Sequence, residues 1–225
     1  MSSSLLSLLV KVLVVALGAF LGWALWDGLS GHSGVRLAEI ALVQVPESGA
    51  SNPVTSVLLN FRGYDTLLEL AVLLTALLGI WSLCPAALPY PPPGLLLTNL
   101  VGWVVPMLII AGGYLLWVGG QAPGGAFQAG ALFGAAGVTL ALAGHPTGGL
   151  PAESHQRLLA TSGTLVFVLM GLGCMLLGLG FLTYPKAIAK WLILTIETAA
   201  TLSIGLILAA AFLGGHPSAG RSHGL

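Results

Sequence analysis

Charged residues are scarce in this sequence. Only 6% of the 225 residues are Asp, Glu, Lys or Arg, whereas about 25% are charged in an ordinary soluble domain. A soluble domain of this length would need many more charges to cover its surface, so the composition excludes that class. Seven basic and seven acidic residues cancel without forming a basic patch, and nucleic acid is therefore not an expected partner.

Cysteine is also scarce, and no group of side chains has the spacing of a catalytic or metal site. Cys84 and Cys174 are far apart in the sequence, which supports neither a disulfide framework nor a zinc or iron–sulfur site. The histidines fall in predicted loops or in the tail, and none has metal-ligand spacing on a helix: His32, His145, His155, His216 and His223. We therefore expect no metal, no cofactor and no enzymatic activity of the chain itself.

Apolar residues are abundant instead, at 56% of the chain. Six apolar segments each approach the roughly 20 residues that span a bilayer. The sequence thus predicts an all-α integral membrane protein of about six transmembrane helices. They are predicted at residues 5–26, 66–83, 98–118, 126–143, 159–182 and 188–213. The first is expected to be a retained helix and not a cleaved signal peptide, because Lys11 interrupts it and Trp23 and Trp26 close it.

Two other stretches organise the chain. In the long loop of about residues 27–64, the segment Val35–Val45 carries Arg36 and Glu39 among aliphatic residues and is predicted as a short strand or a surface-lying segment. Residues 84–97 are rich in proline, which ends a helix and forms a stiff spacer. We therefore predict a two-helix module at 1–83, a linker at 84–97, a four-helix module at 98–213 and a flexible tail at 214–225.

Three ionisable residues fall inside the predicted spans: Lys11, Glu69 and Glu197. Such groups cost several kcal/mol in lipid unless paired or hydrated, so each is a candidate for an ion or proton path. At about 1.5 Å per residue, Glu69, Glu197 and Lys11 would lie about 5, 14 and 21 Å from one membrane face. These depths suggest a ladder across the bilayer. In the alternative reading, Lys11 snorkels to the interface and Glu69 reaches headgroup water.

Of the two carboxylates among these residues, Glu197 is the deeper by sequence position. It stands between Thr195 and Thr198, whose hydroxyls are expected to be within reach of it. We predict either a role in ion movement or a buried polar pair with another subunit.

A polar cluster precedes the second predicted helix and includes Asp65 and Glu69. Four residues apart, these two carboxylates share one face of a helix. Asp65 is also a candidate N-cap with Arg62 as an ion-pair partner, and capping alone would explain it.

A glycine-rich stretch joins the third and fourth predicted spans, at about residues 119–130. It lacks the Gly-Lys-Ser/Thr ending of a phosphate loop. We expect a sharp bend whose exposed backbone groups must be covered by protein or water. After it, Gly130 and Gly134 form a small-xxx-small face suited to close helix packing.

These stretches resemble two known families. Pro46–Val54, followed by Phe61-Arg62-Gly63-Tyr64-Asp65-Thr66 and Glu69, resembles the MbhE-like module, which occurs at the carboxyl end of the large A subunit of Mrp-type cation/proton antiporters and as a separate subunit of membrane-bound hydrogenases. Pro123-Gly124-Gly125-Ala126-Phe127-Gln128-Ala129-Gly130 resembles the Pro-Gly-Gly-Gly-Phe-Gln-Gly-Gly signature of the antiporter B subunit, the MnhB family. Where that family usually has His-Gly-His, this chain has Val118, Gly119 and Gly120.

The resemblance implies an accessory membrane subunit of a hetero-oligomeric Mrp-type antiporter in the cell membrane, which helps form an ion or proton path. It carries Asp65, Thr66 and Glu69 over as motif residues of the first module, and Pro123 to Gly130 over as the loop of the second. Two alternatives remain open. The chain is an ion-translocating subunit of an energy-converting oxidoreductase such as a membrane-bound hydrogenase, or a scaffold that conducts nothing.

Overall fold

The computed structural model describes residues 3–30, 36–83, 93–145 and 147–214, and these residues form helices and turns with no strand among them. Five helices are long and apolar enough to cross a membrane, and a sixth apolar helix of 17 residues is shorter. The chain is thus an all-α membrane protein, as the composition predicts. Most of the predicted proline-rich linker, and the tail after Gly214, lie outside the described residues.

The chain divides into two units, of which the first covers residues 1–40. It consists mainly of α1 (Ser3–Ser30), a single helix of 28 residues. The side chains described in α1 are exposed, including Lys11. A fully exposed apolar helix of this length requires lipid or another membrane helix as its surroundings.

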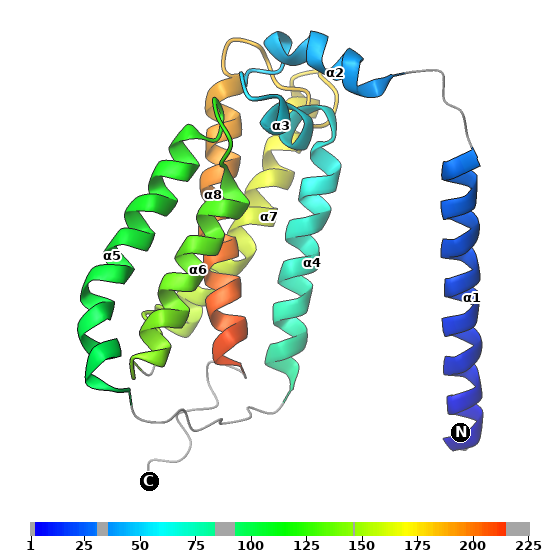
Figure 1. Ribbon diagram of the computed structural model, residues 1–225. Coiled ribbons are helices and arrows are strands. Elements are labelled where there is room, and N and C mark those ends of the chain that lie inside the picture. Colours follow the sequence, from blue (N-terminus) through cyan, green and yellow to red (C-terminus); the bar gives the residue numbers. More distant parts are fainter. Residues whose placement is uncertain (1–2, 31–35, 84–92, 146, 215–225) are drawn as a thin grey trace. The chain divides into compact units, whose positions relative to one another are not determined.

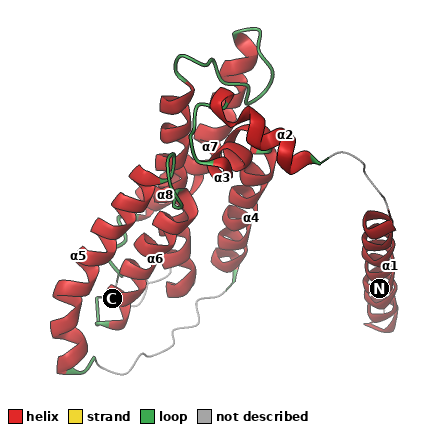
Figure 2. Cartoon of the chain, turned by 45° about the horizontal axis from the view of Figure 1, so that its top comes forward, coloured by secondary structure: helices red, strands yellow, loops and turns green. Residues whose placement is uncertain are grey.

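The second unit, residues 41–225, contains a bundle of five helices that run side by side (Figure 1). These are α4 (Gly63–Ser82), α5 (Leu95–Val118), α6 (Ala126–Leu142), α7 (Glu153–Leu176) and α8 (Ala189–Leu213). Short helical segments lie at the end of the bundle where α4 begins (Figure 2): η1 (Val45–Glu47), α3 (Pro53–Ser56) and the π-helix η2 (Val57–Phe61).

Helix α8 is the centre of this bundle. In its most apolar 18-residue stretch 61% of the residues are buried, against 17–28% in α4, α5 and α7. Helix α8 packs against both α6 and α7. The approach of α6 depends on glycine, because a Cβ atom at Gly130 would lie 2.7 Å from the Cβ of Ile204, and one at Gly134 would lie 2.8 Å from the Cβ of Leu208. Small residues at this spacing bring two membrane helices into close contact.

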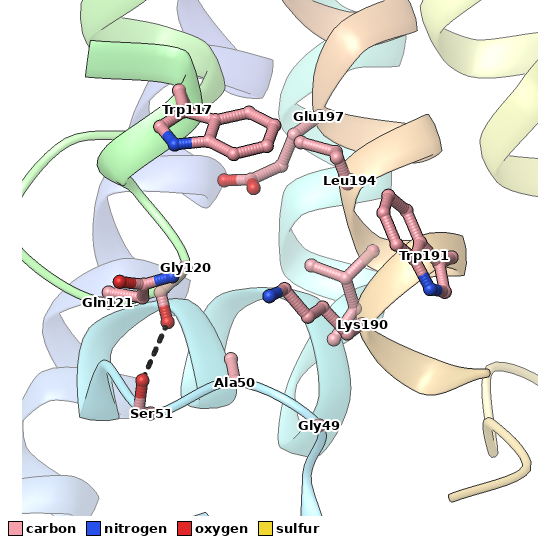
Figure 3. A pocket seen from close by; sticks show the side chains of 11 residues that line it. Gly49, Ala50, Ser51, Trp117, Gly120, Gln121, Lys190, Trp191, Leu194 and Glu197 are labelled. Carbon is pink, nitrogen blue, oxygen red and sulfur yellow. Dashed lines mark hydrogen bonds between the residues drawn. The ribbon is translucent and has the colours of Figure 1, made fainter. Parts of the chain in front are cut away.

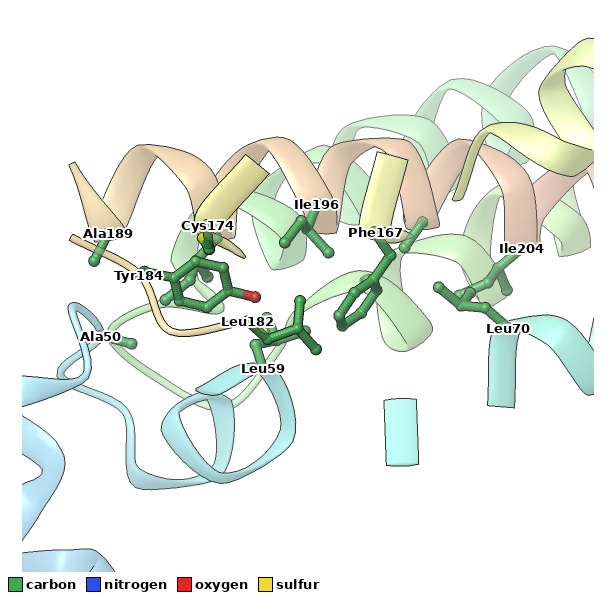
Figure 4. Close-up of a cluster of buried hydrophobic side chains, with 13 residues drawn as sticks. Ala50, Leu59, Leu70, Phe167, Cys174, Leu182, Tyr184, Ala189, Ile196 and Ile204 are labelled. Carbon is green, nitrogen blue, oxygen red and sulfur yellow. The ribbon is translucent and has the colours of Figure 1, made fainter. Parts of the chain in front are cut away.

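The α4 end of the bundle is held by an apolar cluster that α4, η2, α7, α8 and the α7–α8 loop share (Figure 4). Phe167 from α7 is fully buried and lies among Leu59, Leu70 and Leu182. Tyr184 belongs to the same cluster, and burial raises the pKa of its phenol. The cluster joins α4 to the helices that follow the proline-rich stretch.

Two elements differ most from the sequence prediction. The aliphatic segment near residue 40 is a helix, α2 (Leu37–Gln44), and not a strand, since its residues include good helix formers and an Arg36–Glu39 ion pair at 2.6 Å. Helix α7 begins and ends about six residues before the predicted segment. It gains an Arg157–Glu153 pair at 2.7 Å in its first turn, and it ends before Gly178, which has a φ of 77°.

Candidate functional site around Glu197

Glu197 lies on α8 inside the bundle, with only 4% of its surface exposed. It is eight residues into the helix, which is about 12 Å from the first residue of α8. Within the described part of the chain it takes part in no ion pair. A buried carboxylate without a cationic partner is rare in a membrane helix and marks a functional candidate.

The amino terminus of α6 meets this carboxylate. The backbone N–H of Ala126, the first residue of α6, donates a hydrogen bond to Glu197. A helix amino terminus carries a partial positive charge of about half a unit, which stabilises an anionic group placed there. The glycine-rich loop thus positions the amino terminus of α6 against Glu197, where a lysine or arginine side chain would otherwise be expected.

Gly125 makes this approach possible. Its φ is 106°, a region that residues with a side chain rarely adopt, and a Cβ atom there would lie 2.8 Å from Oε1 of Glu197. Gly124 is equally confined, since its Cβ would lie 2.6 Å from the carbonyl oxygen of Leu115. The two central glycines of the loop are therefore required by its geometry.

The neighbouring threonines do not bind the carboxylate, contrary to the sequence expectation. Thr195 donates to the carbonyl of Trp191 at 2.8 Å, and Thr198 donates to that of Leu194 at 2.7 Å. A threonine hydroxyl in a helix readily bonds the carbonyl four residues earlier, and this local bond wins.

The side chain of Asn52 holds the bend between α5 and α6; the sequence places this residue in the Pro46–Val54 stretch but predicts no contact for it. The side-chain amide of Asn52 donates to the carbonyls of Gly119 at 3.1 Å and Ala122 at 2.8 Å, while its Oδ1 accepts from the Val54 N–H and caps α3. Thr55 donates to the Gly119 carbonyl at 2.6 Å. These bonds satisfy carbonyls at the end of α5 that have no partner within the helix.

A cavity of about 140 Å³ opens beside Glu197. Its walls come from α8, from the bend after α5 and from the segment Gly49–Ser51 (Figure 3). In this view the Glu197 carboxylate and the Lys190 side chain both point into the space between α8 and the bend. Glu197 and Lys190 are the two ionisable residues in the cavity wall.

Asp65 and Glu69 occupy a different place. They lie in a wide groove of about 640 Å³ beside α4, whose other lining is apolar and comes from α4, α6 and α8. Glu69 is exposed and Asp65 half-buried. Asp65 forms an ion pair with Arg62, but it is not an N-cap, because α4 begins at Gly63 and Asp65 falls in its first turn.

The other residues of this cluster hold the start of α4 in place. The Thr66 hydroxyl is buried and donates to the carbonyl of Leu58 in η2 at 2.7 Å. Gly63 sits under the α7–α8 loop, where a Cβ atom would lie 2.9 Å from Cδ1 of Leu182. Thr66 and Gly63 therefore have a structural role, because they fix the start of the helix that carries Asp65 and Glu69.

Among the described residues no three His, Cys, Asp or Glu side chains gather in a way that would hold a metal ion. Lys11 lies in the first unit of the chain, so the proposed ladder with Glu69 and Glu197 stays a prediction.

Comparison with known proteins identifies a family for this chain. Residues 96–215 match the model of a family described as a domain related to the MnhB subunit of Na⁺/H⁺ antiporters. The chain belongs to this MnhB-related family. The matched region contains α5 to α8, and with them the Gly-rich loop, Glu197 and most of the cavity wall. No curated protein matches the MnhB-related chain in sequence.

Two solved structures share its fold. A chain of the membrane-bound sulfane sulfur reductase, an archaeal respiratory membrane complex, is 24% identical with a TM-score of 0.65, and the match covers 92% of this chain and 96% of that chain. A chain of the Mrp complex from Dietzia sp. DQ12-45-1b is 22% identical with a TM-score of 0.63. That match covers 96% of this chain but 26% of the other, so the MnhB-related chain spans about a quarter of its length.

Proposed function

We propose that this chain is an accessory membrane subunit of a multi-subunit Mrp-type cation/proton antiporter or a related complex, and that it contributes to an ion or proton path. Glu197 carries the proposal, because it is a buried carboxylate without a cationic partner in the described part of an MnhB-related domain. At the amino terminus of α6 it has a backbone hydrogen-bond donor, and the cavity beside it has room for water. We assign Glu69 and Asp65 to the same path, at the α4 groove.

A second candidate is an ion-translocating subunit of an energy-converting oxidoreductase. One observation favours it: the match to the respiratory-complex chain covers nearly all of both chains. A subunit of the same extent is thus used in a complex of that kind. In either setting we infer that redox chemistry, where present, belongs to other subunits, and that this chain lies in the cell membrane as a multi-pass protein.

We further propose that residues 1–83 are an MbhE-like module and residues 98–213 an MnhB module. Asn52, Thr66 and Gly63 support the first assignment, since each motif residue has a defined contact in the fold. In this reading the clasp of Asn52 on the α5–α6 bend is the junction between the two modules.

The test is gentle extraction of the tagged chain from its native membrane, followed by mass spectrometry of the proteins that come with it. Large antiporter-like subunits support the proposal, and iron–sulfur or other redox subunits among them favour the oxidoreductase. Recovery of the chain alone, as a monodisperse and transporting protein, would contradict an accessory role. A scaffold is indicated instead when neutral variants of Glu69 and Glu197 change complex yield but not transport.

A further inference from the structure

We infer that the cavity beside Glu197 is a water-filled vestibule that connects this carboxylate to the membrane face at which α8 begins. The vestibule gives protons access to Glu197 from that face. This inference rests on the proposed function of Glu197, which it deepens by stating from which side the carboxylate is reached.

The shape of the cavity supports this access. It lies between the first two turns of α8 and the bend after α5, and Gly49, Ala50 and Ser51 form its wall toward the α3 end (Figure 3). Its volume of about 140 Å³ is enough for several water molecules but too small for most organic solutes. Deeper along α8 the interior closes, because Thr201 is fully buried and donates to the Glu197 carbonyl at 2.7 Å.

The polar groups of the wall suit water. Gln121 and Lys190 are exposed at the cavity and offer hydrogen-bond donors to water, whereas the Gly120 carbonyl is already bonded by the N–H groups of Ser51 at 3.0 Å and Asn52 at 3.1 Å. Trp117 and Trp191 supply broad apolar sides. A buried carboxylate that faces water on one side and a backbone amide on the other can gain or lose a proton without moving its helix.

Lys190 determines the charge of the vestibule. It precedes Glu197 on α8 by about two helical turns, or about 10 Å along the helix, and its side chain reaches into the same space. Its positive charge opposes the entry of a metal cation but does not prevent proton transfer through water. For this reason we assign the vestibule to protons and not to Na⁺ or K⁺.

Gly120 keeps the vestibule open. A Cβ atom at Gly120 would meet nothing within 4 Å, although the residue lines the cavity. A large side chain at this position therefore has room to enter the cavity and fill it. At Gly113, on α5, a Cβ atom also meets nothing within 4 Å, and Gly113 is not part of the cavity wall, so it provides a matched control.

The experiment is thiol labelling of single-cysteine variants in the native membrane complex, with Cys84 and Cys174 replaced, using a small membrane-impermeant methanethiosulfonate. Leu194→Cys reports the vestibule, Gln121→Cys its entrance, and Thr198→Cys the exposed outer side of α8 near the depth of Glu197. We expect Leu194→Cys to react from the same membrane face as Gln121→Cys, and about tenfold or more faster than Thr198→Cys, since thiolates form only where water is present.

Adding Gly120→Leu should slow the labelling of Leu194→Cys about tenfold or more, whereas adding Gly113→Leu should leave it unchanged. Adding Lys190→Gln should raise the rate for a positively charged reagent relative to a negatively charged one. The inference is overturned when Leu194→Cys is unreactive although Gln121→Cys reacts, or when Thr198→Cys reacts equally fast.

Labelling does not require transport, so the two proposals fail separately. A reactive Leu194→Cys with normal transport by a Glu197→Gln variant would reject the proposed function of Glu197. Lost transport in Glu197→Gln with an unreactive Leu194→Cys would reject the vestibule.

Discussion

The backbone of Gly125 lies so close to Glu197 that a Cβ atom on it would come within 2.8 Å of Oε1. The positions of Gly125 and Glu197 thus depend on each other. The absence of a side chain at Gly125 leaves space for the carboxylate, and the carboxylate accepts a hydrogen bond from the backbone N–H of Ala126, the first residue of α6. This relationship connects the signature of the loop to the deepest carboxylate of the chain, which are about 70 residues apart in the sequence.

Gly125→Ala should destabilise the chain and impair transport. The substitution places a side chain at a φ of 106°, which costs about 1–3 kcal/mol, and directs its methyl group at Glu197. Thermal unfolding of the purified complex in detergent measures the first effect and vesicle transport the second. The control is Gly102→Ala on α5, where a Cβ atom meets nothing within 4 Å. Equal behaviour of the two variants would contradict the proposed contact.

Glu197→Gln should lower cation/proton exchange by about tenfold or more while the complex still assembles, because the amide keeps the shape of the carboxylate but cannot carry charge. Glu197→Asp keeps the charge and retracts it by one methylene, so we expect partial activity. Proton uptake into vesicles checks both variants against Glu153→Gln, whose carboxylate lies at the opposite end of the bundle in an exposed pair with Arg157. Full activity of Glu197→Gln would remove Glu197 from the path.

Asn52→Ala should lower the unfolding free energy by about 2–3 kcal/mol, because it removes two bonds to loop carbonyls and the cap of α3. Asn52→Asp retains an acceptor for the cap but places a carboxylate against the carbonyls of Gly119 and Ala122. We therefore expect Asn52→Asp to be no more stable than Asn52→Ala. Thermal unfolding tests this order, with Ser82→Ala as the control, since the Ser82 hydroxyl makes an exposed bond to Gly79. An Asn52→Asp variant as stable as the parent chain would show that the clasp contributes little.

Glu69→Gln should reduce either transport or the yield of the assembled complex, because Glu69 is exposed in a largely apolar groove and a carboxylate in such surroundings needs water or a partner. Native gels report assembly and vesicle assays report transport. Asp65→Asn is the companion variant, and its effect should be smaller because Asp65 has an ion-pair partner in Arg62. No effect of Glu69→Gln on either readout would favour simple exposure to headgroup water.

The sequence predicted the helices well because long apolar runs in membrane proteins follow directly from the requirement for internal backbone hydrogen bonding. It also selected Glu197, since a carboxylate in the middle of an apolar run has few explanations. The π-helix η2 and the shifted boundaries of α7 were not predicted, because local ion pairs and bonds such as Thr66 to Leu58 leave no periodic signal.

The role of Asn52 could not be predicted for a different reason. Its partners Gly119 and Ala122 are 67 and 70 residues away, and a single polar residue in a polar loop carries no information about such a distant contact. The cavity is likewise invisible in the sequence, since it depends on a missing side chain at Gly120 and on the direction of Lys190.

The clasp of Asn52 also bears on how the polypeptide is held together. Residues before Leu83 and after Pro93 are joined by side-chain bonds to the α5–α6 bend and by the packing of α4 on α7 and α8. We therefore expect these two parts to associate even without the covalent connection between them. If the chain is split within residues 84–92 and the two fragments are expressed separately, they should associate in the membrane and copurify. Two genes, one for each fragment, would then produce the same folded subunit as one gene for the whole chain.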